Sequence, residues 1–430
     1  MGNNKYKKSE EYLIRAEKTV PLGSQTFSKS KTQLPIGISP FFATKGKGAF
    51  MWDVDGNKYL DFVNSLAAIT LGYNDKKVLK AVRKQLKKGT IFSLAHELEF
   101  KVAEKICEMV PCAERVRFGK NGSDATSGAI RIARAYTKKD YIIVCGYHGW
   151  QDWYIGSTTR NEGVPKATQE LTHKFIYNNI KSLEDKIKEL KGNIAAIIME
   201  PVNIEAPKDD FLQKVKELTH NEGAVLIFDE TVTGFRFSNG GAQEFFGVTP
   251  DLATFGKGIA NGYPLSAVVG KKEIMGFMEE VFFSFTFGGE TLSLAAANAT
   301  LKKLKSEPIV TSIFEKGNYL IEELNKLIRE FGFEDFVSIQ GYPCWSFFVM
   351  KPTGWATSEQ LKTLYMQEMF MHNIFILGTH NLSYSHSIEN IDSLIKVYQL
   401  FFEKLKGIQE KNNMEQVLKV TPLTPLFKVR

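Results

Sequence analysis

Several features are scarce in this 430-residue sequence. The cysteines number only four, and their spacing matches neither a disulfide framework nor a metal site (Cys107, Cys112, Cys145 and Cys344). Apolar runs such as AAIIM and AVLIF are far too short to cross a bilayer. The first residues are polar, so we expect no signal peptide. The sequence therefore predicts a soluble cytoplasmic protein with reduced thiols, no metal and no membrane partner.

Charge of one sign is not concentrated anywhere in the chain. The chain has 55 Lys and Arg residues and 48 Asp and Glu residues. The resulting net charge of +7 is small for a chain of this length. No basic stripe has the form of a nucleic-acid footprint, so we expect no nucleic-acid partner. The ordinary contents of Gly (34), Pro (14) and hydrophobic residues (43%) exclude a disordered or fibrous chain.

The middle of the chain alternates short apolar runs with helical stretches. The runs are RVRFGK, YIIVCG, AAIIME, AVLIFDE, LATFG and LSAVVG. Near-continuous apolar strands separated by helices indicate a mostly parallel sheet covered on both faces. Upstream, Asp55-Gly56 between two β-rich runs predicts a hairpin. After residue 300 helices dominate, with strands near SIQGYPCWSFFVM and NIFIL.

These patterns predict an α/β protein with two domains, since the chain is too long for one small core. We expect a large domain over residues 61–309. A smaller α+β domain would be built from both termini, residues 1–60 and 310–430.

Three strand ends carry polar residues at the edge where α/β sheets place their ligands. Asn121, Gly122 and Ser123 lie between a strand and a helix, where backbone N–H groups and a hydroxyl suit a phosphate. The same residues are also an ordinary loop and helix cap. Asp229 ends a strongly apolar strand, where an unpaired carboxylate is costly. It is either a structural ion pair or the partner of a protonated ring nitrogen.

Lys257 is the third signal. It follows a strand and stands between Gly256 and Gly258, where the backbone can approach a ligand closely. Most lysines are merely solvated, but one in a tight, partly apolar turn can serve as a nucleophilic amine. A phosphate site, a carboxylate for a pyridinium nitrogen and a Schiff-base lysine together match pyridoxal 5'-phosphate. The carboxylate would keep the ring nitrogen protonated, and Lys257 would move the proton of the substrate α-carbon.

The chain resembles the class III (subgroup II, fold type I) aminotransferases that use pyridoxal phosphate. Within that family it is most similar to glutamate-1-semialdehyde 2,1-aminomutase, from about residue 9 to residue 300. The stretches that carry the resemblance are GAFMWDVDGNKYLDF, RVRFGKNGSDATSGAIRIAR, YHGWQD, LIFDETVTGFR, DLATFGKGIANGYPLSAVVG and FTFGGE. The resemblance implies the fold type I transferase fold and a homodimer with shared active sites.

The resemblance also assigns roles by position. Lys257 matches the Schiff-base lysine and Asp229 the acid on the pyridine nitrogen. The other matching positions are a phosphate loop (Gly122, Ser123), an aromatic and an aliphatic side chain on the two ring faces (Tyr147, Val232), an acid near the cofactor (Glu200), and a residue that reaches the phosphate of the neighbouring subunit (Thr286). Tyr147 and Val232 would serve equally well as plain core residues.

The departures from the aminomutase concern its substrate. Lys29 stands in the place of an arginine that holds the substrate carboxylate, and a lysine cannot make the same bidentate fork. Leu66 stands where the family has a tryptophan wall. The lid, residues 156–170, is shorter than in the aminomutase. These changes leave the cofactor positions intact.

We therefore predict an aminotransferase that moves an amino group from an amino donor to a keto or aldehyde acceptor. Sugar-derived and phosphorylated compounds are among the candidate acceptors. The alternative within the family is the aminomutase, which exchanges amine and carbonyl within one molecule and forms 5-aminolevulinate. An alternative from another class is a cofactor-free structural or regulatory relative, against which the intact Lys257 and Asp229 argue.

Overall fold

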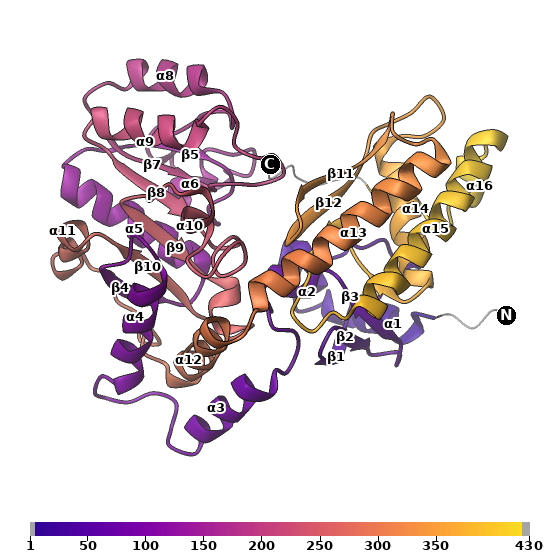
Figure 1. Ribbon diagram of the computed structural model, residues 1–430, viewed down its shortest axis with the longest axis horizontal. Coiled ribbons are helices and arrows are strands. Elements are labelled where there is room, and N and C mark those ends of the chain that lie inside the picture. Colours follow the sequence, from indigo (N-terminus) through magenta and orange to yellow (C-terminus); the bar gives the residue numbers. More distant parts are fainter. Residues whose placement is uncertain (1–4, 424–430) are drawn as a thin grey trace. The chain divides into compact units, whose positions relative to one another are not determined.

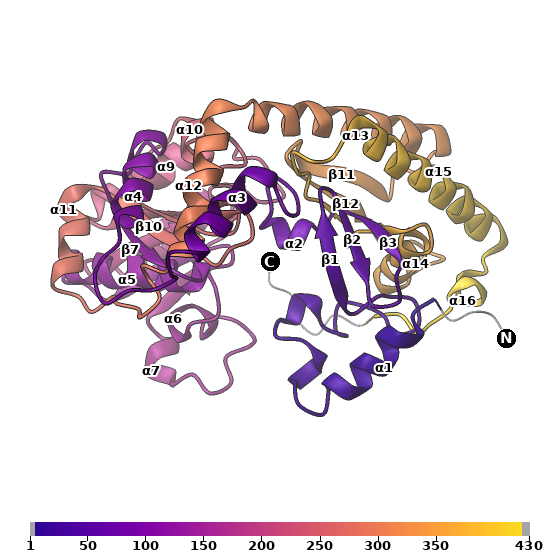
Figure 2. The same cartoon turned by 90° about the horizontal axis from the view of Figure 1, so that it is seen from below.

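The computed structural model describes residues 5–423 and divides the chain into two compact units (Figures 1 and 2). Unit 1 takes the chain up to Leu66, the segment Leu71–Asp75 and the chain from Thr311 onward. Unit 2 takes Ala67–Thr70 and Lys76–Val310.

Unit 2 is built on a seven-stranded sheet. Its strands lie in the order β4 (Arg115–Gly119), β10 (Ser266–Gly270), β9 (Leu252–Phe255), β8 (Val225–Asp229), β7 (Ile194–Met199), β5 (Tyr141–Cys145) and β6 (Thr172–Lys174). β9, β8, β7, β5 and β6 pair in parallel, which confirms the predicted mostly parallel sheet. β10 is antiparallel to both of its neighbours, because the short segment after β9 leaves no room for a helical crossover. β6 escaped prediction because it is short and polar.

Helices cover both faces of this sheet (Figure 1). α5 (Gly122–Thr137) packs on one face, where its small and apolar side chains meet inward-facing residues such as Ile142, Ile198 and Ile227. α8 (Ile180–Glu189) and α9 (Phe211–Asn221) pack on the other face against Ile143 and Ile197. Successive strand residues thus point to opposite faces and both are buried, which explains the continuous apolar runs.

The remaining helices of unit 2 surround this layered core. They are α3 (Lys76–Leu86), α4 (Glu97–Met109), α6 (Asp152–Ile155), α7 (Lys166–Gln169), α10 (Ala242–Phe246), α11 (Lys272–Met275) and α12 (Thr291–Ser306). α12 packs against α3 and α4.

Unit 1 holds two small sheets and several helices. One sheet has the order β1 (Ala43–Lys47), β2 (Phe50–Asp53), β3 (Lys58–Asp61) and β13 (Ile374–Phe375), and the other has β11 (Val337–Tyr342), β12 (Trp345–Met350) and β14 (Thr379–His380). β2 and β3 form the antiparallel hairpin that Asp55-Gly56 predicted, with Gly56 at φ +87°. The helices are α1 (Lys7–Ala16), α13 (Ile309–Phe331), α14 (Ser358–Met371), α15 (Ile388–Lys411) and α16 (Met414–Val417).

The short turn α2 (Asn64–Ala67) has unusual backbone geometry, because four consecutive non-glycine residues adopt φ between +52° and +64°. Such conformations are strained for L-residues and often occur at functional sites. Among residues 5–423, no helix combines the length and the hydrophobicity needed to span a bilayer.

Candidate active site

The site predicted from sequence lies along one edge of the unit 2 sheet. The carboxyl ends of β4, β5, β7, β8 and β9 meet at this edge, because these strands share one direction. Each strand is followed at once by predicted site residues: Gly122 and Ser123 after β4, Tyr147 after β5, Glu200 after β7, Asp229 at the end of β8 and Lys257 after β9. Ligands of open α/β sheets bind at this edge.

Gly122 and Ser123 are the first two residues of α5. Their backbone N–H groups have no carbonyl partner within the helix, and the positive end of the helix dipole adds to them. Asp124 fixes the entry to the helix, since its Oδ2 accepts the Asn121 N–H at 2.7 Å. A Cβ atom on Gly122 would lie 3.0 Å from Cγ2 of Thr231, so glycine allows the β8 loop to approach.

Lys257 occupies a strained position directly after β9. Its φ is +39°, which is rare for a residue with a side chain. The preceding Gly256 lies so close to the start of α5 that its Cβ would be 3.7 Å from Cα of Gly122 and 3.2 Å from Cγ2 of Thr231. The loops after β4, β8 and β9 are therefore packed together, with Thr231 between the other two.

Asp229 is a buried carboxylate with four hydrogen bonds to it. Its Oδ1 accepts the Thr231 hydroxyl at 2.6 Å, the Thr231 N–H at 3.1 Å and the Thr254 hydroxyl at 3.1 Å. Its Oδ2 lies 2.9 Å from Nδ1 of His148. Burial raises the pKa of Asp229, but the hydrogen bond and charge of His148 and the bonds from Thr231 outweigh burial and hold that pKa below its usual range.

Tyr147 and Glu200 are joined to each other. The Tyr147 N–H donates to Oε2 of Glu200 at 3.1 Å, and the Asn203 amide donates to the same oxygen at 3.0 Å. The half-buried Tyr147 ring meets Tyr154 edge to face. Gly149 brings this loop against α5, because a Cβ there would lie 2.5 Å from Cβ of Ser123.

Val232 and Thr286 are the two remaining positions that the resemblance assigned to the cofactor. Val232 is half-buried on the loop after Asp229, next to Thr231. Thr286 is exposed, in the segment between η4 (Gly276–Glu279) and α12. That segment lies beside the end of β4, since a Cβ on Gly119 would be 3.7 Å from the Phe285 ring.

Lys29 and Leu66 come together in a pocket of unit 1. This pocket has a volume of about 310 Å³ and is lined mainly by apolar side chains, including Phe41, Phe42 and Leu377. Asp61 also lines it and is buried. Burial raises the pKa of Asp61, while hydrogen bonds from Tyr73 (2.6 Å) and two backbone N–H groups and the charge of Lys29 oppose that rise.

Comparison with known proteins now identifies the chain. The family model described as "Aminotransferase class-III" matches residues 34–340. The chain belongs to the class-III aminotransferases. A 3-aminobutyryl-CoA aminotransferase of Cloacimonas acidaminovorans is 36% identical over 397 residues, covering 90% of this chain and 94% of the relative. Glutamate-1-semialdehyde 2,1-aminomutase 2 of Lachnoclostridium phytofermentans is 35% identical, covering 92% of this chain and 99% of the relative.

Solved structures agree with the predicted fold. An omega-transaminase from Sphaerobacter thermophilus superposes with a TM-score of 0.83 at 26% identity, covering 92% of this chain and 97% of that one. This class-III aminotransferase therefore has the fold type I architecture, and its cofactor is pyridoxal phosphate.

The residues at the sheet edge fit that cofactor. The start of α5 offers N–H groups and the Ser123 hydroxyl for a phosphate, Asp229 is an ionised carboxylate, and Lys257 carries an amine directly after β9. The glycines at positions 122 and 256 keep these loops in contact where a Cβ atom would crowd them.

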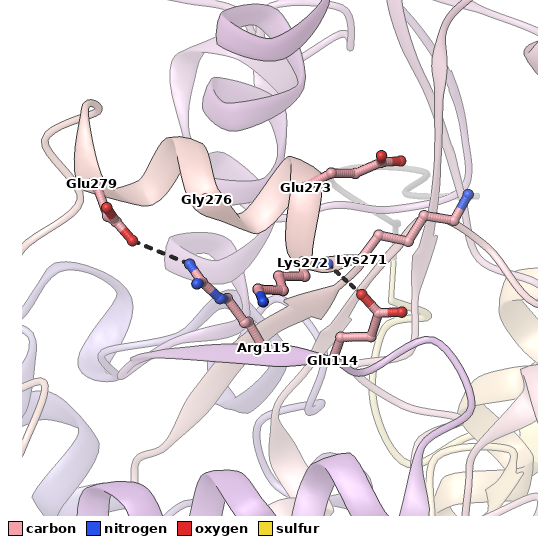
Figure 3. Close-up of a pocket in the computed structure, with 7 residues that line it drawn as sticks. All are labelled: Glu114, Arg115, Lys271, Lys272, Glu273, Gly276 and Glu279. Carbon is pink, nitrogen blue, oxygen red and sulfur yellow. Dashed lines mark hydrogen bonds and ion pairs between the residues drawn. The ribbon is translucent and has the colours of Figure 1, made fainter.

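A larger hollow of this class-III aminotransferase has no part in the candidate site. It has a volume of about 780 Å³ and is lined mostly by charged side chains, which Figure 3 shows. Arg115 forms an ion pair with Glu279 at 3.1 Å, and the backbone N–H of Lys272 donates to Glu114 at 2.6 Å. The hollow adjoins the start of β4 at Arg115, whereas the candidate site lies beyond the other end of that strand.

Two residues that sequence reasoning missed take part in the candidate site. Thr231 donates twice to Asp229 and separates the loops of Gly122 and Gly256. His148 contacts Asp229 from the β5 loop. The signal for His148 was available, because it follows Tyr147 in the YHG stretch, but its contact with Asp229 spans 81 residues of sequence.

Proposed function

We propose that this class-III aminotransferase works through Lys257 and Asp229 at the edge of the unit 2 sheet. The observation that supports this most strongly is the contact of three loops through Thr231, which gathers an amine, a carboxylate and a helix N-terminus. When bound, pyridoxal phosphate supplies an aldehyde that condenses with amines and a ring that accepts electrons. The start of α5, with Gly122 and Ser123, would bind the phosphate.

The proposed roles of the protein groups follow from their chemistry. Asp229 stays ionised and so favours a protonated ring nitrogen. Nζ of Lys257 would hold the cofactor between reactions and, as a free amine, would move the proton of the substrate α-carbon. Tyr147 and Val232 would contact the two ring faces, and Glu200 would act through Tyr147, whose N–H it accepts.

We further propose that the reaction is bimolecular. An amino donor leaves as a carbonyl compound, and a separate keto or aldehyde acceptor leaves as an amine. Lys29 supports this proposal, because it replaces the fork-forming arginine of the aminomutase and its charge acts on the buried Asp61. Such a pocket attracts a free carboxylate weakly.

The apolar pocket of unit 1 favours a substrate whose bound end is uncharged. One relative is named for 3-aminobutyryl-CoA, a compound in which a thioester masks the acyl carboxylate. We therefore propose a β-amino acyl ester or thioester as the amino donor. The aminomutase reaction would instead present a free carboxylate to Lys29 and Asp61.

Asp61→Asn tests this account of substrate choice. Removing the charge that opposes Lys29 should raise kcat/KM for free amino acids relative to neutral acyl amines by roughly tenfold, equivalent to about 1.4 kcal/mol. The asparagine keeps an oxygen for the two N–H groups that Asp61 accepts. Asp53→Asn is the matched control, because Asp53 lines the same pocket but is held by Asn57 and Tyr59.

Wild-type protein should convert 3-aminobutyryl esters or thioesters, whose acyl end is uncharged, with a keto acid as acceptor. It should form little 5-aminolevulinate from glutamate-1-semialdehyde. Efficient aminolevulinate formation, without transamination of any tested donor, would instead support the alternative function of an aminomutase. If the ratio of kcat/KM for the two substrate classes were the same in Asp61→Asn and in wild type, the proposed role of Asp61 in substrate choice would be wrong.

We propose a homodimer in which Thr286 serves the neighbouring subunit. Large apolar side chains that are more than half exposed accompany Thr286 on the two adjoining segments 89–100 and 281–290, namely Leu94, Phe100, Phe282 and Phe287. The two segments touch, since a Cβ atom on Gly289 would lie 2.7 Å from Oε1 of Glu99. Exposed apolar groups in such number are typical of an interface.

Mixing two inactive variants tests the shared site. Lys257→Ala and Thr286→Ala chains, unfolded together and refolded, should regain about a quarter of wild-type activity, because half the dimers are mixed and each mixed dimer has one intact site. Activity no higher than the mean of the two variants, or full activity of a monomer at high dilution, would contradict the proposal.

We also propose a cytoplasmic location. It is supported by the four cysteines, which are all free thiols. Recovery of the enzyme in a membrane or secreted fraction of its own cells would contradict it.

A further inference from the structure

His148 makes two hydrogen bonds with groups that can only accept. It is 1% exposed, and its Nε2 lies 3.1 Å from the Cys145 carbonyl oxygen while its Nδ1 lies 2.9 Å from Oδ2 of Asp229. A carbonyl oxygen has no hydrogen to donate, so Nε2 must carry one.

The proton between His148 and Asp229 can be placed in the same way. If Nδ1 had no hydrogen, its lone pair would face a carboxylate oxygen. That contact would be repulsive unless Asp229 carried the hydrogen instead. Asp229 is already the acceptor of three bonds at Oδ1, from the N–H and hydroxyl of Thr231 and the hydroxyl of Thr254. These three donors face Oδ1 from the protein and stabilise the ionised carboxylate. The hydrogen therefore belongs to Nδ1.

We propose that His148 is a positioning residue that carries a hydrogen on both ring nitrogens and forms a buried ion pair with Asp229. The pair is neutral as a whole, which explains how a carboxylate can remain ionised inside the sheet edge. Its consequence for the cofactor rests on the proposed function of Asp229. An ionised, correctly oriented Asp229 is ready for a ring nitrogen, whereas a protonated one is not.

The surroundings of His148 fix its orientation as well as its charge. The Trp153 ring is stacked on the imidazole at 6.4 Å, and the Tyr154 ring meets it edge to face at 5.3 Å. Each aromatic side chain is fixed by a hydrogen bond of its own. The Trp153 ring N–H donates to the Ser127 hydroxyl, and the Tyr154 hydroxyl donates to the Gly146 carbonyl. The titratable side chains facing His148 from these elements are Asp229 and Tyr154, and only Asp229 bonds to the ring.

Nitrogen-15 NMR of the full-length protein, labelled at its seven histidines, tests the proposal directly. At pH 7.5 and without cofactor, the His148 signals, assigned with His148→Gln, should show two protonated ring nitrogens. His220 provides the matched comparison, because its Nε2 also lies 2.9 Å from an aspartate, Asp251, but its side chain is 40% exposed. Its signals are assigned with His220→Asn. A single protonated nitrogen on His148 would overturn the proposal.

His148→Gln gives a second readout. Glutamine is uncharged and cannot form the ion pair, so the dissociation constant for pyridoxal phosphate should rise roughly tenfold to a hundredfold, the range for hydrogen bonds to charged groups. His220→Asn should leave that constant unchanged. An unchanged constant in folded His148→Gln would contradict the positioning role. If instead Asp229→Asn proved fully active, the cofactor role of Asp229 would fail while the NMR result on His148 would stand.

Discussion

Lys257→Ala should lose turnover by at least about 10⁴-fold, because no other group can replace the amine that holds the cofactor and moves the α-proton. The variant should stay folded. Alanine removes a side chain from a half-buried position, and Gly256 and Gly258 still shape the turn. Steady-state rates with a saturating donor, together with circular dichroism and thermal unfolding, measure the two expectations separately.

Lys272→Ala is the control for Lys257→Ala. Lys272 lies in the charged hollow at the start of β4, away from the candidate site. It should keep near-normal rates, and exogenous amines should partly rescue Lys257→Ala but not a misfolded protein. Turnover of Lys257→Ala within tenfold of wild type would eliminate this lysine as the catalytic amine.

Asp229→Asn should have the second largest effect, a fall in kcat of roughly 10³-fold or more. Asparagine is nearly the same size and can still accept from Thr231, but it carries no charge to stabilise a protonated ring nitrogen. Cofactor binding should weaken less than turnover, because the start of α5 is unchanged. Absorbance titration with pyridoxal phosphate and rapid-mixing kinetics separate binding from chemistry.

Asp251→Asn is matched to Asp229→Asn in its environment. Asp251 is also buried, accepts from a histidine at 2.9 Å and has a pKa held below its usual range despite burial. It lies just before β9, so its replacement should lower stability by about 1–3 kcal/mol without a comparable loss of kcat. A similar kcat loss in both variants would show that charge loss damages the fold, and would contradict a specific role for Asp229.

Much of this architecture could be predicted because the sheet buries both faces. Continuous apolar strands such as Ile194–Met199 and Val225–Asp229 leave a clear pattern, and the polar residues that end them mark one edge. The reversal of β10 was less visible, because a strand pattern does not encode direction. Only the short segment after β9 excludes a crossover.

The candidate site was predictable where chemistry stands at a strand end, as with Asp229 and Lys257. It was not predictable where function depends on long-range packing. Thr231 separates two glycines that lie far apart in sequence, and His148 reaches Asp229 from another strand. The pocket that joins Lys29 to Leu66 also depends on folding, since Phe375 and Leu377, which lie far away in sequence, complete its wall.

The central claim is that Lys257 is the point of covalent attachment for the cofactor. Borohydride reduction of the holoenzyme, followed by peptide mapping with mass spectrometry, tests it most directly. The account predicts one pyridoxyl label per chain, on the peptide that contains Lys257. A label on any other lysine, or no label on a protein that transaminates, would contradict it.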